Sequence, residues 1–228
     1  MADQARVVLE DMVVAAFKIG LLGSVENIAA IAEVVSDYPD VPLILDPVIA
    51  SGRGDELATE DMVAAMKELL LPQTTIVTPN SIEARRLAQD EGSDEEPGLD
   101  ECARRILTLG CEYVLITGTH ENTPMVVNTL YGGPGGGSLR SDSWTRLPGS
   151  FHGSGCTLAS AIAANLANGL DLSDAVHDAQ DYTWQTLQAA FHPGMGQYLP
   201  DRLFWAREAA ADAGSEADPE ADPESGNA

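Results

Sequence analysis

A candidate catalytic or binding segment follows Pro148, where glycines and small polar residues lead into an alanine-rich helical segment. Gly153 and Gly155 permit backbone conformations that larger residues avoid. We expect the hydroxyl of Ser154 or Thr157 to cap the helix that follows. Such a start leaves backbone N–H groups unpaired, with the positive end of the helix dipole behind them, and phosphate is their usual ligand. An ordinary glycine-rich turn before a core helix explains the pattern equally well.

Polar side chains follow several predicted strands, and ligands of parallel α/β sheets bind beyond the carboxyl ends of the strands. These residues are Asp46, Asn80, Thr117 and Thr119. Asn80 and Glu83 are three residues apart at a helix start, which places both side chains on one helix face. Together they suit a hydrated Mg²⁺, which takes few protein oxygens and keeps most of its water. Two structural interpretations stay open: an Asx turn at Asp46, and capping of the helix by Asn80 and Glu83.

Brought to one end of a sheet, these groups predict phosphoryl transfer. The N–H groups of residues 153–156 would hold the developing charge, magnesium would neutralise the nucleotide phosphates, and a base would take the acceptor hydroxyl proton. Cys156 is the first candidate for this base, because a helix N-terminus lowers the pKa of a thiol from about 8.5. His120 and His152 are alternative bases, and a buried filler is the structural alternative for Cys156.

Apolar patterns predict the elements that must position these groups. Strands are expected at 15–20, 43–46, 74–78 and 113–117, and helices at 3–14, 24–37, 59–70, from Asn80 or Ser81, and at 99–109. Strand and helix alternate, which indicates a parallel sheet covered by helices on both faces. Ser24 and Thr59 are the expected caps of their helices. Val7, Val8 and Met12 are expected to face inward from the first helix.

The pattern changes after residue 123. Pro124–Tyr131 and Ser138–Thr145 flank a glycine-rich loop, and this predicts an antiparallel pair of strands within residues 124–147. Further helices are expected at about 171–190 and near 200–210. Residues 208–228 are mostly Ala, Asp, Glu, Pro and Gly, which predicts a disordered acidic tail behind a folded domain of residues 1–207.

Composition narrows the classes of partner. The 228 residues include 36 Asp and Glu against 12 Lys and Arg, a formal charge of -24, which disfavours nucleic acid and anionic membranes. The three cysteines form no CxxC pair and indicate free thiols in a reducing cytoplasm. Cys102 and Cys111 are expected to be buried fillers. The chain opens with no recognisable signal peptide and contains no apolar run long enough to span a bilayer.

Five motifs occur in an informative order: Lys18-Ile-Gly20, Leu45-Asp-Pro-Val48, Val77-Thr-Pro-Asn-Ser-Ile-Glu83, Val114-Leu-Ile-Thr-Gly-Thr-His120 and His152-Gly-Ser-Gly-Cys-Thr157. This order resembles the hydroxymethylpyrimidine and phosphomethylpyrimidine kinases of thiamine biosynthesis, which belong to the ribokinase-like superfamily. The resemblance covers nearly all of residues 5–207. It implies a three-layer αβα fold with a mostly parallel sheet. It also implies ATP-dependent phosphorylation of hydroxymethylpyrimidine and its monophosphate.

The resemblance also implies roles for single residues. Asn80-Ser-Ile-Glu83 resembles the magnesium motif of the superfamily, and Gly153-Ser-Gly-Cys156 resembles its anion hole, with Cys156 as the proposed base. The other implied positions are Asp46 near the phosphates and the metal, Asn80, Thr117 and Thr119 at the nucleotide, and Gly20 and Leu21 at the pyrimidine. Many members of the family have lysine where this chain has Thr117.

The chain departs from the family pattern at its front, because family members begin with a strand and a Gly/Ser/Asp-rich loop that holds the pyrimidine. Without that segment, an edge of the sheet is expected to expose unpaired backbone and to invite pairing with a partner, which leaves a homodimer open. A start codon placed too late, or a second chain that supplies the segment, would account for the same departure. Two further functions stay open: a non-catalytic nucleotide- or pyrimidine-binding remnant, and a vitamin kinase that acts on pyridoxal-type substrates.

Overall fold

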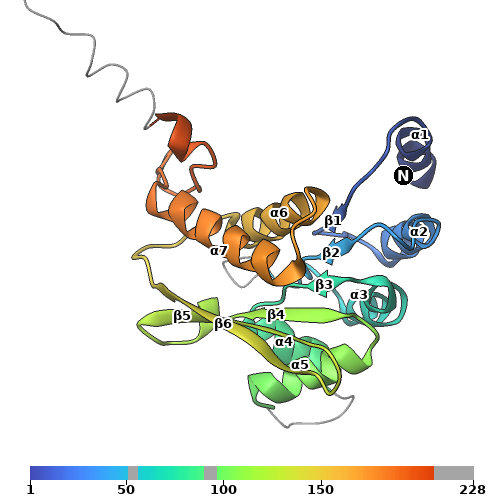
Figure 1. Cartoon of the computed structure of the whole chain (residues 1–228), viewed down its shortest axis with the longest axis horizontal. Helices are drawn as coiled ribbons and strands as arrows, with labels where there is room; N and C mark the ends of the chain where they lie inside the picture. Colours follow the sequence, from blue (N-terminus) through green and yellow to red (C-terminus); the bar gives the residue numbers. More distant parts are fainter. Residues whose placement is uncertain (51–55, 90–96, 208–228) are drawn as a thin grey trace, which may run out of the picture.

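The computed structural model describes residues 1–50, 56–89 and 97–207 of the chain. Within these residues a six-stranded sheet has the order β1-β2-β3-β4-β5-β6. Helices cover both faces of this sheet (Figure 1). The three-layer αβα arrangement predicted from the sequence is therefore confirmed.

The strands pair in two different ways. β1 to β4 run parallel to one another, whereas β5 is antiparallel to both β4 and β6. The bounds are Phe17–Ile19 for β1, Leu43–Leu45 for β2, Ile76–Val77 for β3, Tyr113–Thr117 for β4, Met125–Gly132 for β5 and Gly137–Thr145 for β6. The parallel sheet and the antiparallel pair within residues 124–147 are thus confirmed. The first three strands are shorter than predicted, because their outer residues leave the ladder for the connecting loops.

The core is divided by the sheet into two clusters, because successive side chains of a strand point to opposite faces. Leu43 and Leu45 pack in one cluster and Ile44 in the other. The first cluster is covered by α2 (Val25–Ser36), α3 (Glu60–Ala65), α4 (Ser81–Ala88) and α5 (Leu99–Thr108). The second is covered by α6 (Ser154–Ala167) and α7 (Leu172–Gln188). Apolar strands covered on both faces explain why the sequence shows continuous apolar runs.

The first helix corrects one prediction. α1 spans Ala2–Asp11 and has no buried residue. Val7, Val8 and Met12 were expected to face inward, yet they are 67%, 51% and 61% exposed. An amphipathic pattern shows that a face is apolar, but it does not name what covers that face, and here no described element does.

The caps at two helix starts follow the prediction. The side chain of Ser24 accepts the N–H of Asn27, and that of Thr59 accepts the N–H of Met62. The helix expected at 59–70 is confirmed in position, but its second half is not α-helical. α3 passes into a π-helical turn, η1 (Met66–Leu70), and a 3-10 turn, η2 (Leu71–Gln73). Pro72 in that last turn has no N–H to continue the helical ladder.

The end of the described chain agrees in part with the prediction. α7 begins after Asp171, whose carboxylate caps it. Residues 204–207 are helical. The acidic tail predicted at 208–228 lies outside the described residues, as do residues 51–55 and 90–96.

Candidate active site

The start of α6 is built around a glycine in the left-handed region. Gly153 is the N-cap residue with φ 86°, a conformation that a residue with a side chain adopts only with strain. No side chain caps this helix start, so the expected cap by Ser154 or Thr157 is wrong. The Thr157 hydroxyl instead donates to the carbonyl of Gly153 at 2.7 Å. The first backbone N–H groups of a 14-residue helix are therefore left without a side-chain acceptor.

This helix start faces Asp46, the acid that follows β2. A side-chain carbon placed on Gly155 would lie 3.8 Å from Asp46 Oδ1, so the backbone of the loop lies directly beside the carboxylate. The Cys156 thiol lies close enough to the same carboxylate that each group shifts the pKa of the other. The loop and the acid were predicted to converge at one end of the sheet, and they do.

Lys18 is a member of this cluster that sequence reasoning did not single out. Its Nζ lies 3.3 Å from Asp46 Oδ2, and the Asp46 side chain is only 8% exposed. A carbon on Gly20 would lie 2.7 Å from Nζ, so the bare glycine leaves room for the ammonium. Lys18 lies in β1, which pairs with β2, and Asp46 follows β2, so this contact depends on strand pairing and no local motif shows it.

Burial sets the protonation behaviour of this cluster. It raises the pKa of Asp46, and the neighbouring Lys18 ammonium and Cys156 thiol lower it only in part. Burial, and then the Asp46 charge, also raise the pKa of the Cys156 thiol, against the charges of Lys18 and Arg202. The expectation that the helix N-terminus lowers this pKa is therefore wrong. The residue as a whole is exposed, yet its sulfur lies against a carboxylate that disfavours the thiolate.

Asn80 and Glu83 form the capping arrangement that the sequence left open. The Asn80 side chain accepts the N–H groups of Ile82 and Glu83 at 2.9 and 3.0 Å. Glu83 Oε2 accepts the Asn80 N–H at 2.9 Å, and Oε1 accepts the Ile49 N–H at 3.2 Å. Burial raises the pKa of Glu83 to about 7, despite these bonds, and the charge of Asp46 adds to the rise. Glu83 thus ties α4 to the loop behind Asp46.

Thr117 and Thr119 lie beside Asn80 at the ends of the neighbouring strands. The Thr117 N–H donates to the carbonyl of Pro79 at 2.9 Å. The hydroxyls of Thr117 and Thr119 are 3.1 Å apart, within the turn that contains η3 (Gly118–His120). Gly118 must be glycine, because a side-chain carbon there would lie 2.4 Å from the carbonyl oxygen of Val127.

Arg146 holds this strand-end loop, residues 118–123, and sequence reasoning missed it. Its guanidinium donates to the carbonyls of Thr123 and Thr119 at 2.7 and 2.8 Å, and to those of Gly118 and Glu121 at 3.4 and 2.7 Å. The Gly118 N–H donates in turn to Asn128 Oδ1 at 3.1 Å. No short motif identifies such a clamp, because Arg146 follows β6 and its partners precede β5.

The remaining predicted residues take simpler positions. Leu21 follows β1 and is 63% exposed, and Leu22 after it is buried. His120 and His152 are both exposed. The Cys102 and Cys111 side chains are buried, which confirms their expected role as fillers, and burial raises the pKa of both thiols.

The carboxylates of this site suit a magnesium ion that keeps most of its water. Among the described residues, no three His, Cys, Asp or Glu side chains are arranged to hold a metal ion by themselves. Asp46 and Glu83 are both buried; burial raises the pKa of Glu83, and repulsion by the charge of Asp46 adds to the rise. A divalent cation would relieve that repulsion. Mg²⁺ needs only one or two carboxylates when substrate phosphates and water complete its shell.

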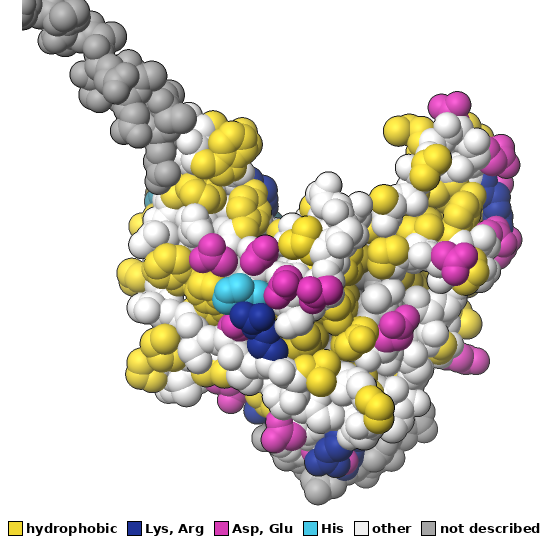
Figure 2. Space-filling model, in the orientation of Figure 1, with side chains coloured by type: hydrophobic (Ala, Val, Ile, Leu, Met, Phe, Trp, Pro, Cys, Tyr) yellow, Lys and Arg dark blue, Asp and Glu magenta, His cyan; other side chains and the backbone are white. Residues whose placement is uncertain are grey.

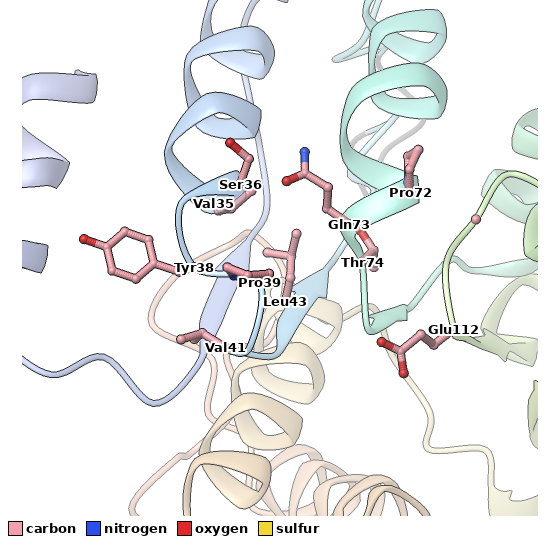
Figure 3. A pocket seen from close by; sticks show the side chains of 11 residues that line it. Val35, Ser36, Tyr38, Pro39, Val41, Leu43, Pro72, Gln73, Thr74 and Glu112 are labelled. Carbon is pink, nitrogen blue, oxygen red and sulfur yellow. The ribbon is translucent and has the colours of Figure 1, made fainter.

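A groove of about 270 Å³ lies elsewhere, at the amino-terminal ends of the parallel strands (Figure 3). Its lining includes Leu43, Thr74 and Glu112, each at or just before the start of a strand. The residues predicted to do chemistry follow the strands instead. None of them lines this groove, so the groove and the candidate active site are separate.

A glycine-bearing helix start that faces buried acids at the carboxyl edge of an αβα sheet defines a kinase-like phosphotransferase of the ribokinase-like class. The pyridoxal kinase of Staphylococcus aureus, in complex with AMP-PCP and pyridoxal, superimposes with a TM-score of 0.75 at 26% identity, over 90% of this chain and 73% of that one. The phosphomethylpyrimidine kinase of Clostridium difficile superimposes with a TM-score of 0.65 at 30% identity, over 82% and 74%. The fold class is therefore shared with solved vitamin kinases.

The family model of phosphomethylpyrimidine kinase matches residues 1–201, and the chain belongs to this family. The hydroxymethylpyrimidine/phosphomethylpyrimidine kinase of Rhizobium meliloti is 34% identical over 203 residues, 86% of this chain and 73% of that protein. The thiamine biosynthesis bifunctional protein ThiED of Geobacter sulfurreducens is 38% identical over 196 residues. The chain spans only 39% of the length of that bifunctional protein. No helix within the described residues is both long and apolar enough to cross a bilayer.

Proposed function

We propose that this chain transfers the terminal phosphoryl group of ATP to the hydroxymethyl group of 4-amino-5-hydroxymethyl-2-methylpyrimidine, and then to the resulting monophosphate. Family membership supports the reaction class. The observation that carries the proposal is the approach of the α6 start to Asp46, where a side-chain carbon placed on Gly155 would lie 3.8 Å from the carboxylate. It supports a site in which N–H donors and a buried acid surround the phosphoryl group during its in-line transfer.

Cys156 acts in this proposal as the base. Its thiolate takes the proton of the acceptor hydroxyl while the oxygen bonds to phosphorus and the bond to ADP breaks; the proton then passes to solvent. Because the pKa of this thiol is raised, the thiolate is the minor form at neutral pH, but it is a stronger base once formed. Lys18 holds the Asp46 carboxylate in place, and the N–H groups of residues 153–156 stabilise the charge on the moving group.

Nucleotide and metal occupy the neighbouring strand ends in this proposal. Asn80, Thr117 and Thr119 line the nucleotide side, and Gly20 and Leu21 line the pyrimidine side. Asp46 and Glu83 would hold Mg²⁺ largely through water. When bound, the ion supplies charge neutralisation for the nucleotide phosphates.

The cysteines, the net charge and the surface of α1 support a proposal for the compartment and the partners of the protein. The free thiols Cys102, Cys111 and Cys156 support a reducing compartment, for which we propose the cytoplasm. The strongly negative charge supports small-molecule partners, not nucleic acid or membrane. The exposed apolar face of α1 is compatible with a homodimer.

A second substrate class is favoured by one observation. The Staphylococcus aureus pyridoxal kinase has a higher TM-score to this chain than the Clostridium difficile enzyme, although its sequence identity is lower. The two acceptors share a hydroxymethyl group on an aromatic heterocycle. Competition between hydroxymethylpyrimidine and pyridoxal for turnover decides between them.

The test is ADP release by the purified protein with ATP, Mg²⁺ and hydroxymethylpyrimidine. The proposal predicts ADP release that depends on the pyrimidine, with a second round on the monophosphate. Binding of nucleotide or pyrimidine without any turnover would instead identify a non-catalytic remnant. Turnover with pyridoxal alone would support the second substrate class.

A further inference from the structure

Arg202 reaches the start of α6 from the last part of the described chain. Its Nε donates to Thr157 Oγ1 at 3.0 Å. Its Nη2 lies 3.0 Å from the position that a side-chain carbon on Gly153 would occupy. The guanidinium therefore lies over the N-cap of α6, and the absence of a side chain at Gly153 makes this approach possible.

The backbone around Arg202 is fixed to α7. The Tyr182 hydroxyl donates to the carbonyl of Arg202 at 2.9 Å, and the Asp201 N–H donates to the carbonyl of Thr186 at 2.9 Å. With its backbone and its Nε both held, the guanidinium has little freedom to leave the loop. Such preorganisation is what a charge-stabilising group in an enzyme needs.

No described carboxylate forms an ion pair with Arg202, whereas most basic side chains in the described chain have one. The adjacent Asp201 is directed elsewhere, to Arg207 Nε at 3.2 Å and to the Leu203 N–H. Acidic residues outnumber basic ones threefold in this chain. Figure 2 shows acidic side chains across one face, with the few basic ones close to them. An arginine left without a carboxylate in such a protein is available to another anion.

The guanidinium suits a phosphoryl group in particular. It has five N–H donors in a planar fork that matches phosphate oxygens, and one of them is used by Thr157. Its charge already reaches the Cys156 thiol, whose pKa it lowers in part. Lys18 and Arg202 thus bring two positive charges close to the Cys156 thiol in this strongly negative protein.

We propose that Arg202 is a catalytic residue that binds the phosphoryl group during its transfer at the start of α6. This inference rests on the proposed function.

The test compares Arg202→Ala, Arg202→Lys and the wild type in pyrimidine-dependent ADP release. We expect kcat of Arg202→Ala to fall by about 10²-fold, the size typical for loss of one preorganised charge-stabilising donor. Arg202→Lys, which keeps the charge but not the fork, should recover part of the loss, and added methylguanidinium should partly rescue Arg202→Ala. Lys67→Ala is the matched control, since it removes one positive charge on the other face of the sheet and should leave kcat unchanged.

Binding provides a second readout that does not depend on turnover. Calorimetry should show that Arg202→Ala weakens ATP binding more than AMP binding, because only ATP presents the terminal phosphoryl group. Equal effects on both nucleotides, or a kcat within twofold of the wild type, would overturn the inference. So would a loss that tracks a fall in Tm and is not recovered in Arg202→Lys. If the wild type turns over neither hydroxymethylpyrimidine nor pyridoxal, the proposed function fails, and the ATP-against-AMP comparison still decides the role of Arg202.

Discussion

Two arginines lie at the same end of the sheet, and their surroundings differ. Arg146 donates to four backbone carbonyls of the strand-end loop, so four of the five N–H donors of its guanidinium are used within the protein. Arg202 donates to one hydroxyl at the α6 start and has no described carboxylate partner. Arg146 therefore fixes the conformation of a loop, whereas Arg202 keeps N–H donors that can bind a ligand anion.

The same contrast extends to the groups around each arginine. Near Arg146, Asn128 is buried and both ends of its amide are bonded, to the Gly118 N–H and to Gln180. Near Arg202, no side chain caps the start of α6. The buried Asp46 carboxylate lies beside the Cys156 thiol, and its negative charge raises the pKa of that thiol. Buried polar groups are normally satisfied, and exceptions are concentrated where proteins bind or react. We therefore assign the residues around Arg146 to the structural support of the site, and those around Arg202 to its reactive part.

The largest expected effect is on the reactive side. Cys156→Ala should lower kcat by about 10²–10⁴-fold, the range for loss of a general base, while ATP still binds. Tm should stay close to that of the wild type, since the residue is exposed. Steady-state ADP release measures kcat, titration calorimetry measures ATP binding, and thermal unfolding measures Tm. Near-normal turnover would remove Cys156 from the mechanism.

Wild-type turnover should also depend on pH in a definite direction. A base works in its deprotonated form, so kcat should rise with pH and keep rising above the ordinary thiol pKa of about 8.5, because burial and the charge of Asp46 raise the pKa of Cys156. A profile that levels off below pH 8 would contradict this assignment.

The buried Glu83 should make stability depend on pH. Its pKa is about 7 in the folded protein against 4.5 ordinarily, so the folded state binds this proton more tightly than the unfolded state. This contribution is present below pH 4.5 and is lost as pH rises through 7, by up to about 3 kcal/mol. Urea unfolding without divalent cations should show the decline for the wild type and a flatter profile for Glu83→Gln. Parallel profiles would show that Glu83 is not the group responsible.

Arg146→Ala should affect stability first. Its four carbonyl partners lose a charged donor, and we expect the free energy of unfolding to fall by about 1–3 kcal/mol. Arg146→Lys should not restore it, because an ammonium cannot reach carbonyls spread along the loop as a planar fork does. This is the reverse of the recovery expected for Arg202→Lys. Recovery by lysine at 146 would erase the distinction between the two arginines.

The smallest effect is expected at the N-cap glycine. Gly153→Ala forces a side chain into the left-handed region, which costs about 1–2 kcal/mol, and pushes against Arg202 Nη2. Gly169→Ala is a matched control, with φ 85° and no atom within 4 Å of the added carbon. Both should lose similar stability, but only Gly153→Ala should also lower kcat.

Much of this arrangement could be predicted from the sequence, because strand ends are local features. The apolar runs before Asp46, Asn80 and Thr117 place these residues at one edge of a parallel sheet without knowledge of tertiary contacts. Lys18, Arg146 and Arg202 could not be predicted in their roles, since each acts on residues far along the chain. The pKa of Cys156 was predicted in the wrong direction for the same reason: the helix start is local, whereas Asp46 approaches through the fold. For α1 the sequence predicted an apolar face correctly, but no described element covers that face.

The central claim is that phosphoryl transfer occurs at the start of α6. A crystal structure with the ATP analogue AMP-PCP and Mg²⁺ tests it most directly. The account predicts a terminal phosphate within hydrogen-bond distance of the N–H groups of residues 153–156 and of Arg202, on the side that faces Asp46. A nucleotide whose terminal phosphate lies away from this helix start, for example in the groove at the amino-terminal ends of the parallel strands, would contradict it.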